Sequence, residues 1–285
     1  MTFTPTYGRI WRISYPLIVA GVSETIVEVT DTVFLARYGV TELAAIGLAA
    51  AIYGIALALI YGFVDGIQIL LARRAGEGRD VEVGRVFNQG LYLLVLTAVA
   101  LILVIKLAVP ALTAELFASA AVHAAVDDYL QIYAVALLFE AVNLAYSVFY
   151  VGIGRTRVLI GAAAVLAVTN ILFDYLLIFG RFGFPELGIQ GAAIASLAAE
   201  AAAFVFLSID VARRGYVRTY GLLRFGSWDR RIARLVGFIS VPVSLEALLE
   251  TIRWFVLFVI IEQLGEEMLA KANIVYSIYA VLLIP

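Results

Sequence analysis

A carboxylate and an amide lie one helical turn apart inside one of the most apolar stretches of this chain. In NILFDYLLIFG, residues 170–180, Asp174 follows Asn170 by four positions, the spacing that places two side chains on one face of a helix. A charged side chain near the centre of a membrane helix costs roughly 2.5 to 3.5 kcal/mol on insertion scales. A neighbouring amide can donate to the carboxylate or share a hard cation through its oxygen. The pair is therefore a candidate proton or cation site.

The first apolar stretch carries three acidic residues that share one face of a predicted helix. Glu24, Glu28 and Asp31 are spaced i, i+4, i+7, which aligns them on that face. Three ionised groups inside a membrane would cost roughly 7 to 10 kcal/mol in total. They must therefore face water or a cleft, carry protons, or hold a cation. Burial and the nearness of like charges both favour the protonated form of a carboxylate, which is the property that a proton carrier needs.

The composition is that of a membrane protein. Hydrophobic residues make up 64% of the 285 residues, charged residues 15%, and the mean hydropathy is +1.01, far from the average for soluble domains. The absence of cysteine excludes disulfides and Cys-ligated zinc, and a single histidine excludes a His-rich zinc site. With no P-loop either, the sequence gives no support to an enzyme, a bound cofactor or a nucleic-acid partner. The expected partner is the lipid bilayer.

Eight apolar segments approach the length of about 20 residues that a membrane-crossing helix needs. We expect an all-α, polytopic membrane protein with spans near 14–37, 43–71, 87–109, 124–151, 157–179, 188–211, 235–262 and 268–285. Of the 20 basic residues, fifteen fall in the N-terminal segment and the loops on its side, and four fall on the other side. This bias predicts a cell (inner) membrane protein with a cytoplasmic N-terminus.

An internal repeat predicts two lobes. Residues 14–59 align without a gap to 240–285, matching Pro16 with Pro242, Glu24 with Glu250 and Gly39 with Gly265. An even number of spans separates the copies, so the repeat is parallel.

The predicted organisation is an N-terminal six-helix lobe over 1–211, a basic cytoplasmic linker over 212–234, and an incomplete second lobe, helices 7 and 8, over 235–285. We expect helices 7 and 8 to sit apart from the first six. The linker is interpreted as a cytoplasmic loop that follows the positive-inside rule. Alternatively, it forms a short interfacial helix that binds lipid headgroups or a partner. Completing the repeat would give a parent chain of about 450 residues.

Four stretches resemble the multidrug and toxic compound extrusion (MATE) family of cation-coupled exporters. They are VTDTVFLARYG (29–39), ARRAGEGR (72–79), GIGRTR (152–157) and NILFDYLLIFGRFGFPELGIQGAAIASLAAE (170–200). The resemblance implies two six-helix lobes around a central cleft. The cleft would open alternately to either side as H⁺ or Na⁺ enters and an organic, often cationic, compound leaves, so no ATPase is required.

The resemblance also implies candidate coupling residues, which lie in different lobes in different branches of the family. In the archaeal and DinF-like branch the matching positions form the cation or proton site. Here those positions are Asp31, Asn170 and Asp174, with Ser196 at a position that is often threonine. The only metal implied is a possible Na⁺ at the first three.

Glu250 matches a glutamate that binds the coupling cation in the NorM branch, although a neutralising pair with Arg253 is an alternative. The first cluster could instead be a structural hydrogen-bond network between helices. Which lobe couples transport stays open at this point.

Other intramembrane polar residues are candidates for lining the cleft or for pairing with neighbours. They are Glu24, Glu28, Glu140, Asn143, Glu200 and Glu246. Three other functions compete with export. A lipid-linked oligosaccharide flippase would favour a cationic groove, whereas the intramembrane charges here are mainly acidic. A retinal protein needs a mid-membrane lysine, and both lysines lie at span ends. A non-transporting membrane fragment or scaffold is the third.

Overall fold

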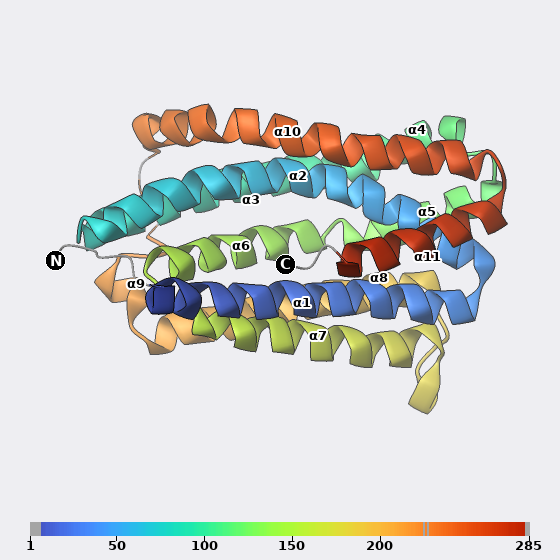
Figure 1. Ribbon diagram of the computed structural model, residues 1–285, viewed down its shortest axis with the longest axis horizontal. Helices are drawn as coiled ribbons and strands as arrows, with labels where there is room; N and C mark the ends of the chain where they lie inside the picture. Colours follow the sequence, from blue (N-terminus) through green and yellow to red (C-terminus); the bar gives the residue numbers. More distant parts are fainter. Residues whose placement is uncertain (1–6, 225, 227, 283–285) are drawn as a thin grey trace.

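The structure is a computed structural model that describes residues 7–224, 226 and 228–282 of the chain. Within these residues every regular element is helical, which confirms the all-α prediction. The long helices lie side by side along one direction (Figure 1). Their bounds are α1 Tyr7–Tyr38, α2 Val40–Gly76, α3 Asp80–Leu107, α4 Val109–Leu116, α5 Ala120–Tyr133, α6 Ala136–Gly152, α7 Arg157–Ile178, η1 Arg181–Gly183, α8 Ile189–Arg213, α9 Tyr216–Thr219, α10 Arg230–Glu262 and α11 Glu266–Leu282.

Each predicted span overlaps a long helix, except that the fourth span is divided. Five helices, α2, α3, α7, α8 and α10, are long and apolar enough to cross a membrane, and the bent pair α5 and α6 makes a sixth if it is one span. The 17-residue α11 and α1, which carries three acidic residues, are not among them. The helices are thus those of a multi-pass membrane protein.

The fourth predicted span, 124–151, is broken between α5 and α6. The two helices meet at an angle of 50°. Around the break the backbone hydrogen bonds span three residues instead of four: the amide of Val135 donates to the carbonyl of Ile132, and that of Leu137 donates to the carbonyl of Ala134. Such i to i+3 bonds tighten a helix locally. No proline or glycine lies at this point of the sequence, so the usual signal for a kink is missing.

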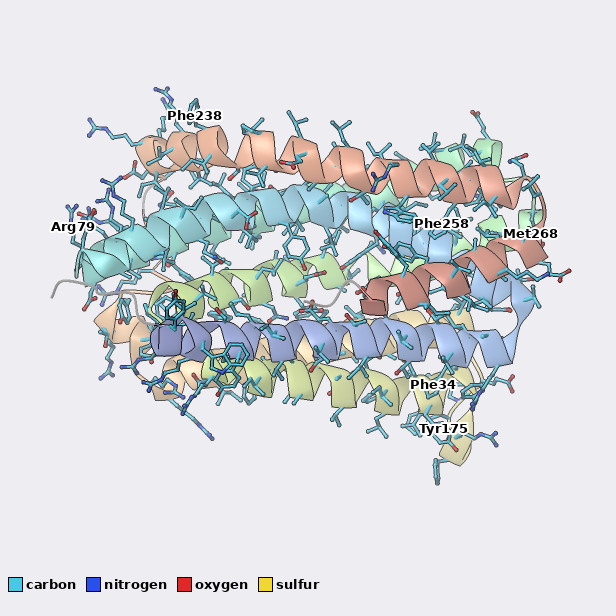
Figure 2. All side chains as sticks on the ribbon, viewed as in Figure 1. Phe34, Arg79, Tyr175, Phe238, Phe258 and Met268 are labelled. Carbon is cyan, nitrogen blue, oxygen red and sulfur yellow. The ribbon has the colours of Figure 1, made fainter. Side chains whose placement is uncertain are left out.

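The bundle is organised around α2. Its most apolar 18-residue window is 72% buried, whereas that of α10 is 17% buried. The largest fully buried side chains include Phe87, Tyr146, Phe149 and Tyr150. On the outside of α10, Phe238 is 82% exposed and points away from the other helices (Figure 2). An apolar side chain exposed in this way is what a lipid-facing surface requires.

The expectation that the last two helices sit apart from the first six is wrong. Helix α10 packs along α2, and α11 contacts both α2 and α1. Two glycines of α2 permit the close approach: a Cβ atom on Gly62 would lie 2.8 Å from the Cα of Ser244, and one on Gly66 would lie 3.1 Å from the carbonyl oxygen of Val236. Small residues let membrane helices come this near. We call this contact the α2–α10 seam.

The predicted linker 212–234 is held against α3. The side-chain amide of Asn88 donates to the carbonyl of Gly221 at 2.9 Å and accepts from the amide of Leu223 at 2.8 Å. Gln89 accepts from the backbone of Asp229 at 3.0 Å, and Asp229 in turn caps the first turn of α10. Helix α8 runs on to Arg213 and α10 begins at Arg230. The irregular part is therefore shorter than the sequence suggested.

The turn between α2 and α3 is held by ion pairs. Glu77 accepts from Arg74 at 2.9 Å, from Arg73 at 3.1 Å and from Arg79 at 3.3 Å. The neighbouring guanidinium groups, that of Arg74 first, lower the pKa of Glu77 to about 2. A lowered pKa means that the pairs persist at neutral pH and are lost only as the pH falls towards that value.

A buried carboxylate joins the turn after α10 to the start of α5. Glu262 is 2% exposed. Its two oxygens accept from the backbone amides of Ala118 and Ser119, both at 2.9 Å. Glu266 next to it accepts from the hydroxyl groups of Ser119 and Thr41. We call this group of contacts the α10–α5 clamp.

The α10–α5 clamp predicts a large stability difference between two neighbouring glutamates. Glu262→Ala leaves two backbone amides without their charged acceptor, so we expect a loss of about 2 to 4 kcal/mol in unfolding free energy. The matched control is Glu267→Ala, since the ion pair of Glu267 with Lys271 is exposed, and such pairs contribute little. Unfolding of the purified chain in a denaturing detergent titration measures both. Equal losses in the two variants would contradict the clamp.

Candidate functional site

The structure brings together the four residues predicted for a cation or proton site. Asp31 comes from α1, Asn170 and Asp174 from α7, and Ser196 from α8. Their exposed fractions are 8%, 0%, 0% and 7% respectively. Helix α7 packs against both α8 and α1, and the polar faces of the three helices meet inside the bundle. The spacing of four between Asn170 and Asp174 therefore does place both on the inward face of one helix.

The amide of Asn170 lies at the centre of this cluster. With its nitrogen towards the carboxylates, it donates to Oδ1 of Asp31 at 3.0 Å and to Oδ2 of Asp174 at 3.1 Å. Its oxygen then accepts from the Ser196 hydroxyl at 3.1 Å. One amide thus links both acids and the hydroxyl.

One carboxylate oxygen of the cluster accepts no hydrogen bond. Oδ1 of Asp174 is buried and has no hydrogen-bond partner. Among the described residues, no arginine or lysine forms an ion pair with Asp31 or Asp174. Two buried carboxylates without a cationic partner repel each other, and a proton or a bound cation relieves that repulsion. Carboxylate and hydroxyl oxygens are ligand types of a hard cation, and the oxygen of Asn170 would join them if its amide turned around.

The cluster contains two carboxylates, Asp31 and Asp174, which is fewer than the three or more acidic, His or Cys ligands of a common metal site. In the part of the chain that the structure describes, no three His, Cys, Asp or Glu side chains are grouped so that they could hold a metal ion. Any cation at Asp31 and Asp174 would need amide and hydroxyl oxygens, or water, to complete its shell.

Three of the candidate cleft residues form hydrogen bonds within residues 1–211. The hydroxyl of Tyr53 donates to Oε2 of Glu140 at 2.8 Å. Asn143 donates to Oε2 of Glu200 at 2.8 Å and to the Glu200 backbone oxygen at 3.0 Å. Oδ1 of Asn143 is buried without a partner. Glu140, Asn143 and Glu200 are therefore parts of a partly buried polar layer between α2, α6 and α8.

The remaining acids of α1 lie at the edge of that layer. Glu24 and Glu28 are exposed, and Glu24 lies near Glu140 and Glu200. Tyr61, 41% exposed, also lies near Glu140 and Glu24. An aromatic face beside several acids is a surface that suits a flat organic cation.

The second-lobe candidates all lie on α10. Glu246 is exposed on α10. Glu250 is also on α10, but its side chain lies outside the part that the structure describes. The guanidinium carbon of Arg253 lies 5.9 Å from the centre of the Trp254 ring.

Two tyrosines beside the cluster were not singled out from the sequence. Tyr129 on α5 adjoins Ser196, Asp31 and Asp174. Its ring lies 5.2 Å from that of Tyr133, which stacks at 4.2 Å on Tyr53, the partner of Glu140. The aromatic groups thus connect the Asp31–Asp174 cluster to the Glu140–Glu200 layer. Both tyrosines stand four apart on α5, a spacing that could have indicated a shared face.

Curated relatives of this chain are described as "Probable multidrug resistance protein NorM". The relative from Rhizobium meliloti (strain 1021) is 29% identical over 274 residues, which is 95% of this chain and 58% of the relative. The one from Aromatoleum aromaticum (strain DSM 19018 / LMG 30748 / EbN1) is 28% identical over 282 residues, 96% of this chain and 59% of the relative. The chain thus spans somewhat under two thirds of the length of these relatives.

Solved structures share the fold. A multidrug resistance MATE family transporter of the MOP superfamily in its inward-facing conformation matches with a TM-score of 0.78 and 21% identity, over 93% of this chain and 60% of that one. The outward-facing conformation of such a transporter matches with a TM-score of 0.76 and 23% identity, over 84% and 52%.

The family model MatE matches residues 16–176, more than half of the chain. The matched range contains three members of the cluster, Asp31, Asn170 and Asp174. The fold, the membrane helices and this match agree with one another. The chain is therefore a multi-pass membrane protein that belongs to the MatE (MATE) family.

Proposed function

We propose that this chain forms the first part of a secondary exporter that uses a H⁺ or Na⁺ gradient to expel organic, often cationic, compounds. The observation that carries the proposal is the buried cluster of Asp31, Asn170 and Asp174, in which one carboxylate oxygen has no partner. The description of the curated relatives as multidrug resistance proteins supports the same class of substrate.

The coupling step is an exchange of charge at this cluster. An ion from outside binds between Asp31 and Asp174, or a proton neutralises one of them, and the repulsion between the two acids falls. Helix α1, which carries Asp31 and has Pro16 in its first half, then repacks against α7. A proline removes one backbone bond from a helix and makes it a natural place to bend. Substrate leaves because the two arrangements of the helices bind it with different affinity.

The substrate path runs along the acidic edge of the polar layer. Glu24, Glu28 and Tyr61 offer negative charge and an aromatic face to an organic cation. The orientation that we propose has the N-terminus in the cytoplasm, which places the basic linker residues inside. An ion gradient is sufficient to drive this cycle, so no ATPase is required.

We also propose that further helices complete a second lobe around α10 and α11. The parallel repeat of 14–59 in 240–285 and the length of the curated relatives support this arrangement. The cluster on α1 and α7 favours coupling in the first lobe, as in the DinF-like branch, with Glu250 as a second position to test.

Dye efflux from cells tests the proposal. Cells that lack their own exporters are loaded with a fluorescent cationic dye and express the complete reading frame that encodes this chain. We expect efflux that stops when the H⁺ or the Na⁺ gradient is collapsed and that continues when ATP is depleted but the gradient is clamped. Efflux that follows ATP rather than either gradient, or no efflux despite membrane insertion, would contradict a secondary exporter.

A further inference from the structure

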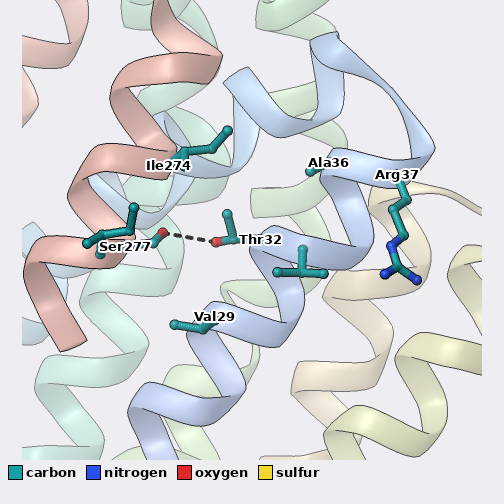
Figure 3. Close-up of a pocket in the computed structure, with 8 residues that line it drawn as sticks. Val29, Thr32, Ala36, Arg37, Ile274 and Ser277 are labelled. Carbon is teal, nitrogen blue, oxygen red and sulfur yellow. Dashed lines mark hydrogen bonds between the residues drawn. The ribbon is translucent and has the colours of Figure 1, made fainter.

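An apolar groove runs between α1 and α11, on the side of α1 away from the Asp31–Asp174 cluster. Its volume is about 370 Å³. Figure 3 shows α1 and α11 side by side, with Thr32 and Ser277 facing one another across the gap. The apolar walls are formed by Val29, Val33, Ala36, Ile274 and Ile278.

The two hydroxyl groups in the groove are already satisfied. Oγ1 of Thr32 donates to the backbone oxygen of Glu28 at 2.9 Å and lies 3.3 Å from Oγ of Ser277. They therefore offer little to a polar ligand, and of the other lining residues only Arg37 carries a polar side chain. A groove of this kind takes up an apolar chain rather than water.

The guanidinium group of Arg37 lies at one end of the groove. Arg37, in the last turn of α1, lines it and is exposed. Among the described residues Arg37 forms no ion pair. Val29, Val33 and Arg37 are spaced by four, so they share one face of α1. From Val29 to Arg37 the helix rises about 12 Å, close to half of a hydrocarbon core about 30 Å thick.

We propose that this groove binds an anionic phospholipid, with one acyl chain against Val29, Val33 and Ile278 and the phosphate paired with Arg37. The apolar length fits one leaflet, and an arginine at a helix end reaches the headgroup level. A cationic compound would meet repulsion from Arg37, and a soluble anion would find no further donor in the apolar wall. This proposal does not depend on the exporter function.

Native mass spectrometry of the purified chain tests the site. The protein is exchanged into detergent with equal amounts of phosphatidylglycerol and phosphatidylcholine, and the lipid retained per chain is counted. We expect phosphatidylglycerol to be retained in preference, and Arg37→Gln to lower its retention about five-fold. Arg181→Gln is the matched control, because Arg181 is also an exposed arginine but lies on η1 outside the groove. It should retain phosphatidylglycerol as the parent does.

A second variant fills the groove without touching the charge. Val33→Trp places an indole between α1 and α11 and should lower retention of the lipid even though Arg37 is present. Unchanged phosphatidylglycerol retention in both Arg37→Gln and Val33→Trp would overturn the proposal, and so would equal retention of phosphatidylcholine. A dimer of the chain that Val33→Trp abolishes, without any change in lipid retention, would instead assign the groove to a second copy. Loss of the bound lipid when the complete reading frame is expressed would assign it to following helices.

Discussion

Asp174→Asn should abolish ion-coupled export and leave the helical bundle folded. Asparagine has nearly the shape of aspartate, so the packing of a side chain that is 0% exposed is preserved. The substitution removes the negative charge and replaces one of the two carboxylate oxygens by an amide nitrogen. Without that charge, Asp31 has no second carboxylate with which to share a proton or cation. Because a buried charge is removed rather than stranded, stability should stay equal or rise slightly.

Two measurements separate loss of coupling from loss of folding. Gradient-driven dye efflux should fall to the level of cells without the protein, while the thermal unfolding midpoint of the purified variant stays at or above that of the parent. The control is Asp128→Asn, an exposed aspartate on α5 that should export normally. Normal efflux by Asp174→Asn would exclude this cluster as the coupling site.

The same variant also identifies the ion without any transport. A ligand that binds only the folded state stabilises it by mass action, about 2.7 kcal/mol at a concentration of 100 times its dissociation constant. If Na⁺ binds between Asp31 and Asp174, the midpoint should rise with NaCl and not with choline chloride, and Asp174→Asn should abolish the rise. If H⁺ is the ion, Na⁺ should have no specific effect, and the pH dependence of the midpoint should differ between parent and variant.

The cluster was predictable from the sequence because its members obey local rules. Asn170 and Asp174 stand four apart in an apolar helix, and Asp31 lies in another, so each had to face inward to avoid lipid. Their meeting across α1 and α7 came from the family resemblance rather than from spacing. Tyr129 was missed since tyrosines are common in this chain and nothing local marks one that touches Ser196.

Two features, the α10–α5 clamp and the break between α5 and α6, could not be predicted from the sequence. Glu262 ends a helix and looks like any polar residue at a membrane boundary. Its partners are backbone amides of Ala118 and Ser119, more than 140 positions away, and backbone groups leave no trace in side-chain patterns. The break near Val135 has neither proline nor glycine, so no local sequence signal marks it.

Gly62→Ala should weaken the α2–α10 seam. A Cβ atom on Gly62 would overlap the Ser244 hydroxyl and lie 2.8 Å from the Ser244 Cα. A side chain can turn away, but backbone cannot, so α10 must shift as a whole. Overpacking of this kind costs typically 1 to 3 kcal/mol. The matched control is Gly237→Ala on α10 itself, where the added methyl group meets nothing within 4 Å and should be neutral or slightly stabilising.

Cross-linking measures the seam directly, because the chain has no cysteine of its own. A Cβ atom on Gly54 would lie 3.3 Å from Cγ2 of Thr251, so cysteines placed at these two positions should form a disulfide on mild oxidation. Adding Gly62→Ala should lower the rate of cross-linking several-fold, whereas adding Gly237→Ala should leave it unchanged. Equal rates in the two backgrounds would mean that the glycines of α2 do not set the distance to α10. A lower rate only with Gly62→Ala would establish that the last two helices are held to the first six by close backbone contact.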